Sequence, residues 1–339
     1  PVIVLTGICS MGACIFNSYR HFTIPAIASV LFPLGMVVSI VLLGDVLGVI
    51  AIPVGALVGM SAQTIVLITA LTRGKRSFRL AFKFRSPGFL ETMRSIFPRL
   101  VAFIVNRLNM MVDRVFASAL GGGYISALSY ADRIVQISVI LFTNSLIRAA
   151  MPVLCKLNSV GDGEGFRNMF GKMSGMLFFF TIPASVVLIL FGGPIVDILL
   201  QRGAFDAQAG AMTSYALMFY GLGLLPFSFT IVLSVFFYAA NDSITPMKAA
   251  LVCFGLNTIL DVVLVKLLAH GGLALATSLV AVAGSGLLLW SLNKKKGPFD
   301  MRRIGTSFMK ILSAGVVMGV VAWLALGYLT GGVSRDYTW

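Results

Sequence analysis

Long apolar stretches dominate this sequence and constrain its fold more than any other feature. A helix needs about 20 apolar residues to cross the hydrocarbon core of a bilayer, and ten stretches approach or exceed that length. They cover residues 1–18, 24–44, 46–72, 96–120, 124–154, 173–200, 209–239, 246–269, 271–293 and 305–331. Only 11% of the residues are charged, against roughly 25% in soluble domains. The sequence therefore predicts an all-α, polytopic membrane protein.

The positive charge is concentrated on one side of the predicted membrane domain. The formal net charge is +14, with seven Lys or Arg residues in 73–94, three in 156–172 and five in 294–303. If the helices alternate in direction, these segments share one side, and the opposite loops hold only Arg202. An excess of basic residues marks cytoplasmic loops. We predict that the charge sets topology and that nucleic acid is not a partner, because no basic-aromatic module accompanies it.

One basic segment divides the chain. Residues 73–95 alternate basic and apolar side chains, as expected for a segment in the membrane interface on anionic headgroups or for a solvated basic loop. We interpret it as a cytoplasmic connector between the end of an N-terminal helical lobe, residues 1–72, and a C-terminal helical lobe, residues 96–331. The opening apolar run also suggests that the chain lacks its start.

One helix start carries a clear local signal. Thr245 followed by Pro246 suits an N-cap residue with proline at the first helical position. We therefore expect a helix to begin at Pro246.

A polar stripe crosses the apolar stretch 124–154. At 100° per residue, Ser126 and Asn144 lie within about 20° of Arg133, and Ser129, Gln136 and Arg148 lie within about 60°. Such a stripe favours a water-filled or substrate-filled cavity over a single buried ion pair. Asp132 points about 100° away from Arg133, so it can pair with another helix. Arg133 is then free to bind an anion, and its planar fork suits phosphate oxygens.

The preceding stretch adds two more arginines. Arg107 and Arg114 are seven residues apart and share a helical face. Ionisable groups at membrane depth are functional candidates by default, with a structural ion pair as the alternative. A cavity lined by several arginines and few carboxylates would attract an anionic substrate.

A second constellation is rich in oxygen. Asn257 and Asp261 are four residues apart on one predicted helix, and Asp113 and Thr277 lie at a similar depth on two others. With the backbone carbonyl of Leu273, these residues form a set of ligands for a hard cation, and sodium suits such sets in secondary transporters. A proton site on one carboxylate and a purely structural helix junction remain alternatives.

Motifs of enzymes are missing from the sequence. There is no phosphate-binding Walker loop, no HExxH, no GxSxG and no metal-spaced Cys/His set. We therefore predict a transporter rather than an enzyme, driven by an ion gradient or the membrane potential, with no cofactor apart from a candidate sodium ion.

Several blocks resemble one known family. FPRLVAFIVNRLNMMVDRVFASALGGG is followed by SYADRIVQ, MPVLCK, LLQRGAFDAQA, FYAANDSITPMK and GLALATS. Their order and spacing resemble the bacterial lipid II flippases, MurJ/MviN, of the multidrug/oligosaccharidyl-lipid/polysaccharide exporter superfamily. Gln136 departs from the Glu that many members carry, and ISVILFTNS replaces a stretch that commonly holds a Pro-x-Gly bend. Arg107 and Arg114 stand where uncharged residues are common.

The resemblance implies a fold, a substrate and roles for single residues. It implies a two-lobed transporter of fourteen helices around a central cavity, of which this chain covers about the fourth to the thirteenth. It implies movement of lipid II, the undecaprenyl-diphosphate-linked peptidoglycan precursor, across the bacterial inner membrane. Arg133 and Asp132 match the family's cavity-lining YADR block. The family's sodium ligands map onto Asp113, Asn257, Asp261, the Leu273 carbonyl and Thr277.

Other functions remain open at this stage. The chain could export another lipid-linked polysaccharide, or a cationic drug by cation coupling, although a drug exporter should have a cavity lined by acids. A membrane scaffold without transport is the alternative from a different class. We expect a monomer whose partners are lipid II or a related polyprenyl-diphosphate glycolipid and anionic membrane lipids.

Overall fold

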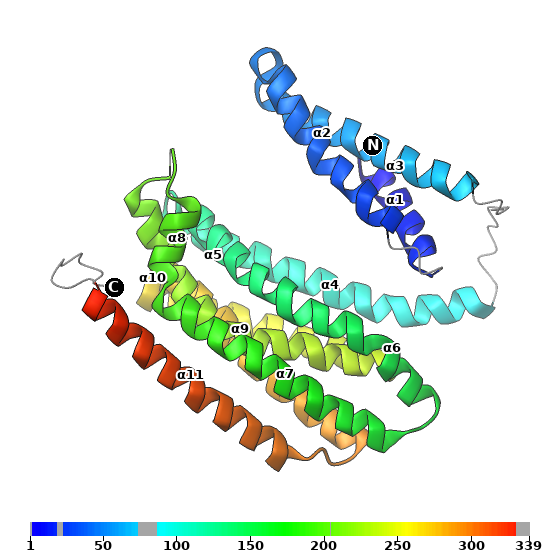
Figure 1. Cartoon of the computed structure of the whole chain (residues 1–339), viewed down its shortest axis with the longest axis vertical. Helices are drawn as coiled ribbons and strands as arrows, with labels where there is room; N and C mark the ends of the chain where they lie inside the picture. The colour runs from blue at the N-terminus through cyan, green and yellow to red at the C-terminus, as the bar shows by residue number, and fades with distance from the viewer. Residues whose placement is uncertain (1, 19–22, 74–86, 204, 330–339) are drawn as a thin grey trace. The chain divides into compact units, whose positions relative to one another are not determined.

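The protein is helical throughout its described part. The computed structural model describes residues 2–18, 23–73, 87–203 and 205–329. All regular elements in these ranges are helices, which confirms the predicted all-α class. The chain divides into two compact units, Pro1–Lys83 and Phe84–Trp339; Figure 1 colours the first in blue and the second from cyan to red.

The first unit is built from three helices joined by close backbone contact. They are α1 (Val2–Ser18), α2 (Thr23–Leu47) and α3 (Ala51–Arg73), with a 3-10 turn, Gly48–Ile50, between the last two. Gly35 of α2 faces Gly55 and Gly59 of α3. A Cβ atom at Gly35 would lie 2.6 Å from the Gly59 Cα atom, so only glycine permits this approach. Small residues allow helices in membranes to pack in this way.

The second unit contains the remaining helices. They are α4 (Pro87–Leu120), α5 (Tyr124–Ser138), η2 (Val139–Asn144), α6 (Ser145–Ser159), α7 (Gly163–Leu190), α8 (Gly192–Leu200), α9 (Ala207–Ala239), α10 (Ile244–Lys296) and α11 (Met301–Leu329). In Figure 1, α9 runs through the middle of this unit, and it packs against α5, α6, α7, α8 and α10. Its core is aromatic, with Phe166 and Phe170 of α7 packed edge-on against Phe236 of α9.

Helix α4 extends further toward the N-terminus than its apolar stretch. It begins at Pro87, a residue type favoured at the first helical position, and the predicted span begins at residue 96. The last part of the predicted connector 73–95 is therefore helical, and its residues 74–86 lie outside the described part of the chain. The lobe boundaries proposed from the sequence stay a prediction.

A π-helical segment interrupts the helix that carries Arg133. Residues Val139–Asn144 of η2 are π-helical, at the place where the sequence lacks the Pro-x-Gly bend of the resembling family. A π-helix turns less per residue than an α-helix. The uniform 3.6-residue repeat assumed for Asn144 and Arg148 is therefore wrong, whereas Ser126, Ser129 and Gln136 share the regular helix α5 with Arg133.

Helix α10 is a hairpin of two helical halves. Ala269 breaks it with φ 48° and ψ −131°, a conformation that L-residues other than glycine rarely adopt. A Cβ atom at Gly272 would overlap the Leu264 carbonyl, so the second half turns back directly onto the first. The break falls between the predicted stretches 246–269 and 271–293.

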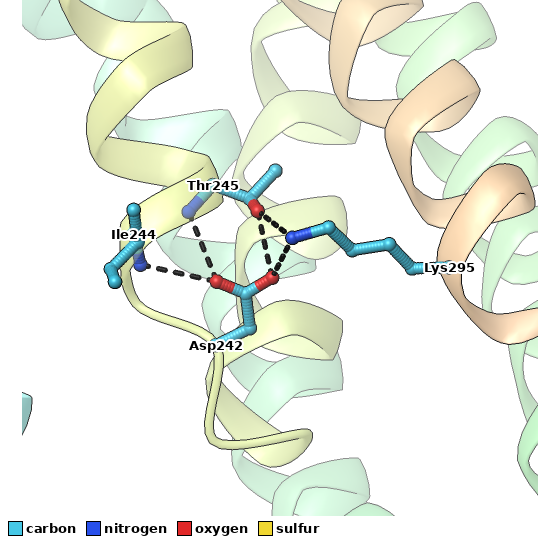
Figure 2. A network of polar contacts seen from close by, with 4 residues as sticks. All are labelled: Asp242, Ile244, Thr245 and Lys295. Atoms are coloured by element: carbon cyan, nitrogen blue, oxygen red, sulfur yellow. Dashed lines mark hydrogen bonds and ion pairs between the residues drawn. The ribbon is translucent and has the colours of Figure 1, made fainter.

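Polar contacts join three loops at one end of the second unit. Lys295 Nζ lies 2.7 Å from Asp242 Oδ2 and 2.6 Å from Thr245 Oγ1, as Figure 2 shows. Lys296 Nζ donates to Asn158 Oδ1 at 3.1 Å. The loops after α6, α9 and α10 thus meet on the same side, consistent with alternating helices. The Thr245 N-cap prediction is wrong, because α10 begins at Ile244 and Asp242 Oδ1 accepts from the Ile244 and Thr245 amides.

The helices are long and apolar enough to cross a membrane. Six described stretches meet that criterion. They are Thr23–Thr72, Tyr124–Ser159, Gly163–Leu190, Ala207–Ala239, Ile244–Lys296 and Met301–Ala325. The first contains both α2 and α3, and the fifth contains both halves of α10. The chain is therefore a multi-pass membrane protein, and the count of ten spans stays a prediction.

Candidate functional site

Two carboxylates and an amide meet where α4 packs against α10. Asn257 Nδ2 donates to Asp113 Oδ1 at 2.9 Å and to Asp261 Oδ2 at 2.7 Å. The Asn257 and Asp261 side chains are completely buried. The helical repeat explains the contact within α10, because residues four apart lie one above the other. We call Asp113, Asn257 and Asp261 the carboxylate cluster.

The carboxylate cluster has spare acceptors. Asn257 Oδ1 and Asp261 Oδ1 are buried and have no hydrogen-bond partner in the described structure. A buried oxygen without a partner costs about 1–3 kcal/mol, so a helix junction built only for stability would avoid two of them. Within the described residues, no group of three or more His, Cys, Asp or Glu side chains gathers as a metal site. The two free oxygens of the carboxylate cluster are an amide oxygen and a carboxyl oxygen, and oxygen ligands of this kind suit a hard cation.

The other two predicted cation ligands lie on the second half of α10. Thr277 Oγ1 donates to the Leu273 carbonyl oxygen at 3.0 Å. Within the described residues, no hydrogen bond joins Thr277 to the carboxylate cluster. The structure thus brings together three of the five predicted ligands and leaves Leu273 and Thr277 as a separate pair.

A small cavity connects Thr277 with the predicted substrate residues. Its volume is about 40 Å³, which is room for a few water molecules. Its polar walls come from α5, α9 and α10, namely Asp132, Gln136, Tyr220, Thr277 and Ser278. Asp132 and Gln136, assigned from the sequence to the substrate site, therefore share one cavity with Thr277, assigned to the cation site.

Asp132 and Arg133 have different surroundings. Asp132 is half-buried at the cavity, where Gln136 Nε2 approaches its Oδ1 atom at 3.4 Å. Arg133 is exposed and makes no hydrogen bond or ion pair with any described residue. Adjacent positions on a helix point about 100° apart, so this difference follows from the backbone alone.

The remaining candidates are less tightly held. Arg107 and Arg114 are exposed on α4, and Arg107 lies over the Phe103 ring at 5.0 Å. Asn144 is half-buried at the end of the π-helical segment. The structure gives these three side chains no shared partner among the described residues.

Two polar residues of the cavity wall were not identified from the sequence. Tyr220 lies in the apolar stretch of α9, and Ser278 lies next to Thr277. Ser278 Oγ donates to the Phe219 carbonyl oxygen at 2.8 Å. A Cβ atom at Gly223 would overlap Ser278, so this glycine lets α9 approach α10 at the cavity. The FYGLG run around Tyr220, with its two glycines, was the available signal.

The family model and the similar curated proteins name the same family. The family model described as "Lipid II flippase MurJ" matches residues 1–337. A lipid II flippase MurJ of Burkholderia cenocepacia is 27% identical over 97% of this chain and 65% of its own length. A probable lipid II flippase MurJ of Buchnera aphidicola is 25% identical over 96% of this chain and 64% of its own. The chain thus spans just under two thirds of these relatives.

Solved structures support the same fold. A lipid II flippase MurJ in an inward closed conformation aligns with a TM-score of 0.76 at 25% identity, covering 96% of this chain and 66% of that chain. A Vibrio cholerae MATE transporter, VcmN, aligns with a TM-score of 0.65 at 11% identity and shows the fold alone. With the family model matching nearly the whole sequence, this chain belongs to the lipid II flippase MurJ family.

Proposed function

We propose that this protein is a flippase that moves lipid II across the inner membrane by alternating access. It acts as a transporter and not as an enzyme. The observation that carries the proposal is Arg133, an exposed arginine that makes no hydrogen bond or ion pair with any described residue, on a helical stretch long enough to cross the membrane. Family membership gives the substrate class, and the inward closed relative is consistent with a protein that changes access.

The chemistry of Arg133 suits the proposed substrate. An unpaired charge at membrane depth costs at least about 2.5–3.5 kcal/mol, so it is retained where it meets water or an anion. Guanidinium binds phosphate oxygens through two parallel hydrogen bonds. We propose that Arg133 binds the diphosphate, with Arg107, Arg114, Gln136 and Asn144 as further contacts. Asp132 positions α5 through the cavity that it lines.

The architecture of the whole protein is part of the proposal. We propose the fourteen-helix, two-lobed arrangement with a central cavity that the resemblance implies. A single chain carries out transport, and anionic lipids contact its basic cytoplasmic face.

Complementation tests the flippase assignment. The whole protein should restore growth of a strain depleted of its own lipid II flippase, and Arg133→Ala should abolish that rescue. Arg302→Ala, which removes an exposed arginine at the start of α11, is the matched control and should rescue fully. Full rescue by Arg133→Ala at normal expression would reject the role of Arg133. Failure of the unaltered protein, with transport of a different polyprenyl-diphosphate glycolipid in vesicles, would favour the polysaccharide exporter instead.

We further propose that sodium binds at the carboxylate cluster. The two buried oxygens without partners, Asn257 Oδ1 and Asp261 Oδ1, support this fit. Asp113, Asn257 and Asp261 would hold the ion, and the Thr277 hydroxyl and Leu273 carbonyl are proposed as the further ligands. Sodium supplies a positive charge that relieves the repulsion between the two carboxylates. The cluster can thus link the packing of α4 against α10 to the sodium gradient.

Thermal unfolding in sodium, potassium and choline chloride tests this site. Sodium should raise the unfolding temperature of the unaltered protein, and Asp261→Ala should remove that rise. Asp45→Ala, which removes an exposed carboxylate of α2, should keep it. A sodium response that survives in Asp261→Ala would reject the site, and a response to pH without one to sodium would assign a proton instead.

A further inference from the structure

A second cavity lies away from the candidate site. It has a volume of about 500 Å³ and lies between the N-terminal halves of α7 and α11. Its charged and polar walls are formed by Arg167, Asn168 and Lys172 of α7 with Asp300, Arg303 and Ser307 at the start of α11. Nothing in the proposed flipping pathway uses these residues.

The cavity has a positive net charge, and its basic side chains have no hydrogen-bond or ion-pair partner among the described residues. Arg167, Lys172 and Arg303 make no hydrogen bond or ion pair through their side chains with any described residue. The single carboxylate, Asp300, caps α11 by accepting from the Arg303 amide at 3.0 Å. Two nearby cations are engaged instead, since Lys295 pairs with Asp242 and Lys296 with Asn158. Three unpaired cations that converge on one cavity form an anion site, and guanidinium favours phosphate.

The depth of the cavity limits the kind of anion. Both flanking helices are membrane-length stretches, Gly163–Leu190 and Met301–Ala325, so the cavity begins near the membrane boundary and extends along α7 toward Met176. The apolar part of the wall includes Met176, which is 55% exposed. Further along α7, Phe179 is 61% exposed. A ligand here therefore meets cations at one end and an apolar, membrane-facing surface at the other.

We propose that this cavity binds the phosphate headgroup of an anionic phospholipid of the inner membrane, with the acyl chains lying along α7. The arrangement matches the attraction of clustered basic residues to anionic headgroups at the cytoplasmic surface. This site deepens the contact of anionic lipids with the basic cytoplasmic face proposed above, and it rests on the cavity and its unpaired cations, not on lipid II transport.

Two variants test the site in different ways. Replacing Arg167, Lys172 and Arg303 by Gln removes the charge. Gly171→Phe fills the cavity, since a Cβ atom at Gly171 would meet nothing within 4 Å. The matched controls are the triple variant of Lys156, Lys248 and Lys294 to Gln, which loses the same charge elsewhere on this side, and Gly286→Phe, at an equally open glycine of α10.

The experiment measures lipid binding to the whole purified protein by native mass spectrometry and by thermal unfolding in mixed micelles. Phosphatidylglycerol should bind and raise the unfolding temperature, whereas phosphatidylcholine and inorganic phosphate should not. The cavity triple variant and Gly171→Phe should each weaken phosphatidylglycerol binding by about tenfold or more, and both controls should stay within about twofold.

Three results would overturn the proposal. Equal loss in the control triple variant would assign binding to general surface charge. An equal rise in unfolding temperature with inorganic phosphate alone would show that the cavity binds phosphate and does not select a lipid. Unchanged binding in the folded Gly171→Phe variant would place the lipid outside this cavity.

Discussion

Helix α10 carries two polar clusters whose oxygens are satisfied to different degrees. At its N-terminal end, both Asp242 oxygens accept hydrogen bonds, from the Ile244 and Thr245 amides, the Thr245 hydroxyl and Lys295. In its middle, the carboxylate cluster leaves two buried oxygens without partners. The first cluster is complete without a ligand, and the second is not. Counting lone pairs therefore separates a structural cluster from a candidate binding site more clearly than residue types do.

The electrostatics of Asp242 fit a structural role. Burial alone would raise the pKa of Asp242, but the hydrogen bonds from Lys295 and Thr245 outweigh it and hold that pKa below its ordinary value of 3.8. The carboxylate is therefore stabilised by the fold, and the fold is stabilised by the charged carboxylate.

The largest expected effect comes from replacing Asp261 with Leu. This substitution should abolish complementation and the sodium response together. In sodium-free buffer it should leave the unfolding temperature unchanged or raise it, because an apolar side chain removes a buried carboxyl oxygen that has no partner among the described residues. Thermal unfolding in choline chloride checks the stability. A loss of several degrees would show that the carboxylate cluster is structural, like the Asp242 cluster.

A smaller effect is expected for Asp242→Ala. It removes the cap of α10 together with the Lys295 contact, and loss of a capping side chain costs about 0.5–2 kcal/mol. Chemical unfolding should show this destabilisation. The sodium-dependent rise in unfolding temperature should be kept in full. A simultaneous loss of that rise would mean that the two clusters are coupled through α10.

A still smaller effect is expected for Lys295→Met. Lys295 is 52% exposed at its side chain, and ion pairs of this kind contribute about 0–1 kcal/mol. The difference from the unaltered protein should shrink as potassium chloride increases, because salt screens exposed charges. A difference that does not change with salt would assign the contribution of Lys295 to packing. Lys294→Met removes a neighbouring exposed lysine and is the control.

The smallest effect is the pH dependence of the Asp242 cluster. Because its folded pKa is lowered, the stabilisation is fully present above the ordinary carboxyl pKa and is lost as pH falls through the folded value. The difference in free energy of unfolding between the unaltered protein and Asp242→Asn should therefore be constant near neutral pH and shrink below pH 3.8. A difference that grows on acidification would contradict the assigned direction.

The features that the sequence predicted correctly are those that depend on the length of apolar stretches and on the spacing of residues along one helix. Apolar length gave the helical class, and a four-residue separation placed Asn257 beside Asp261. The adjacency of Asp132 and Arg133 predicted that they would face different neighbours, and their surroundings do differ. The role of each residue stays a prediction.

Other features depend on the fold and could not be predicted. Lys295 lies 53 residues from Asp242, and only the turn at Ala269 brings them together. Pro246 predicted a helix start, but α10 begins at Ile244 and Asp242 caps it from upstream. The π-helical segment escaped detection because a 3.6-residue repeat was assumed throughout. Tyr220 was missed because tyrosine is common in apolar helices, and its place in the cavity depends on contacts with α5 and α10.

The contact between Asp113 and Asn257 also has a consequence for synthesis of the chain. These residues are 144 positions apart, which at translation rates of 5–20 residues per second corresponds to roughly 7–30 s. During that time Asp113 of α4 has no hydrogen bond from the Asn257 amide. The two halves of α10 are separated only by Ala269. We therefore expect both halves, with Asn257 and Thr277, to insert together as a hairpin. Asp113 of α4 thus lacks its hydrogen bond to Asn257 until α10 is synthesised. We expect an insertase that shields Asp113 from lipid to act during this interval.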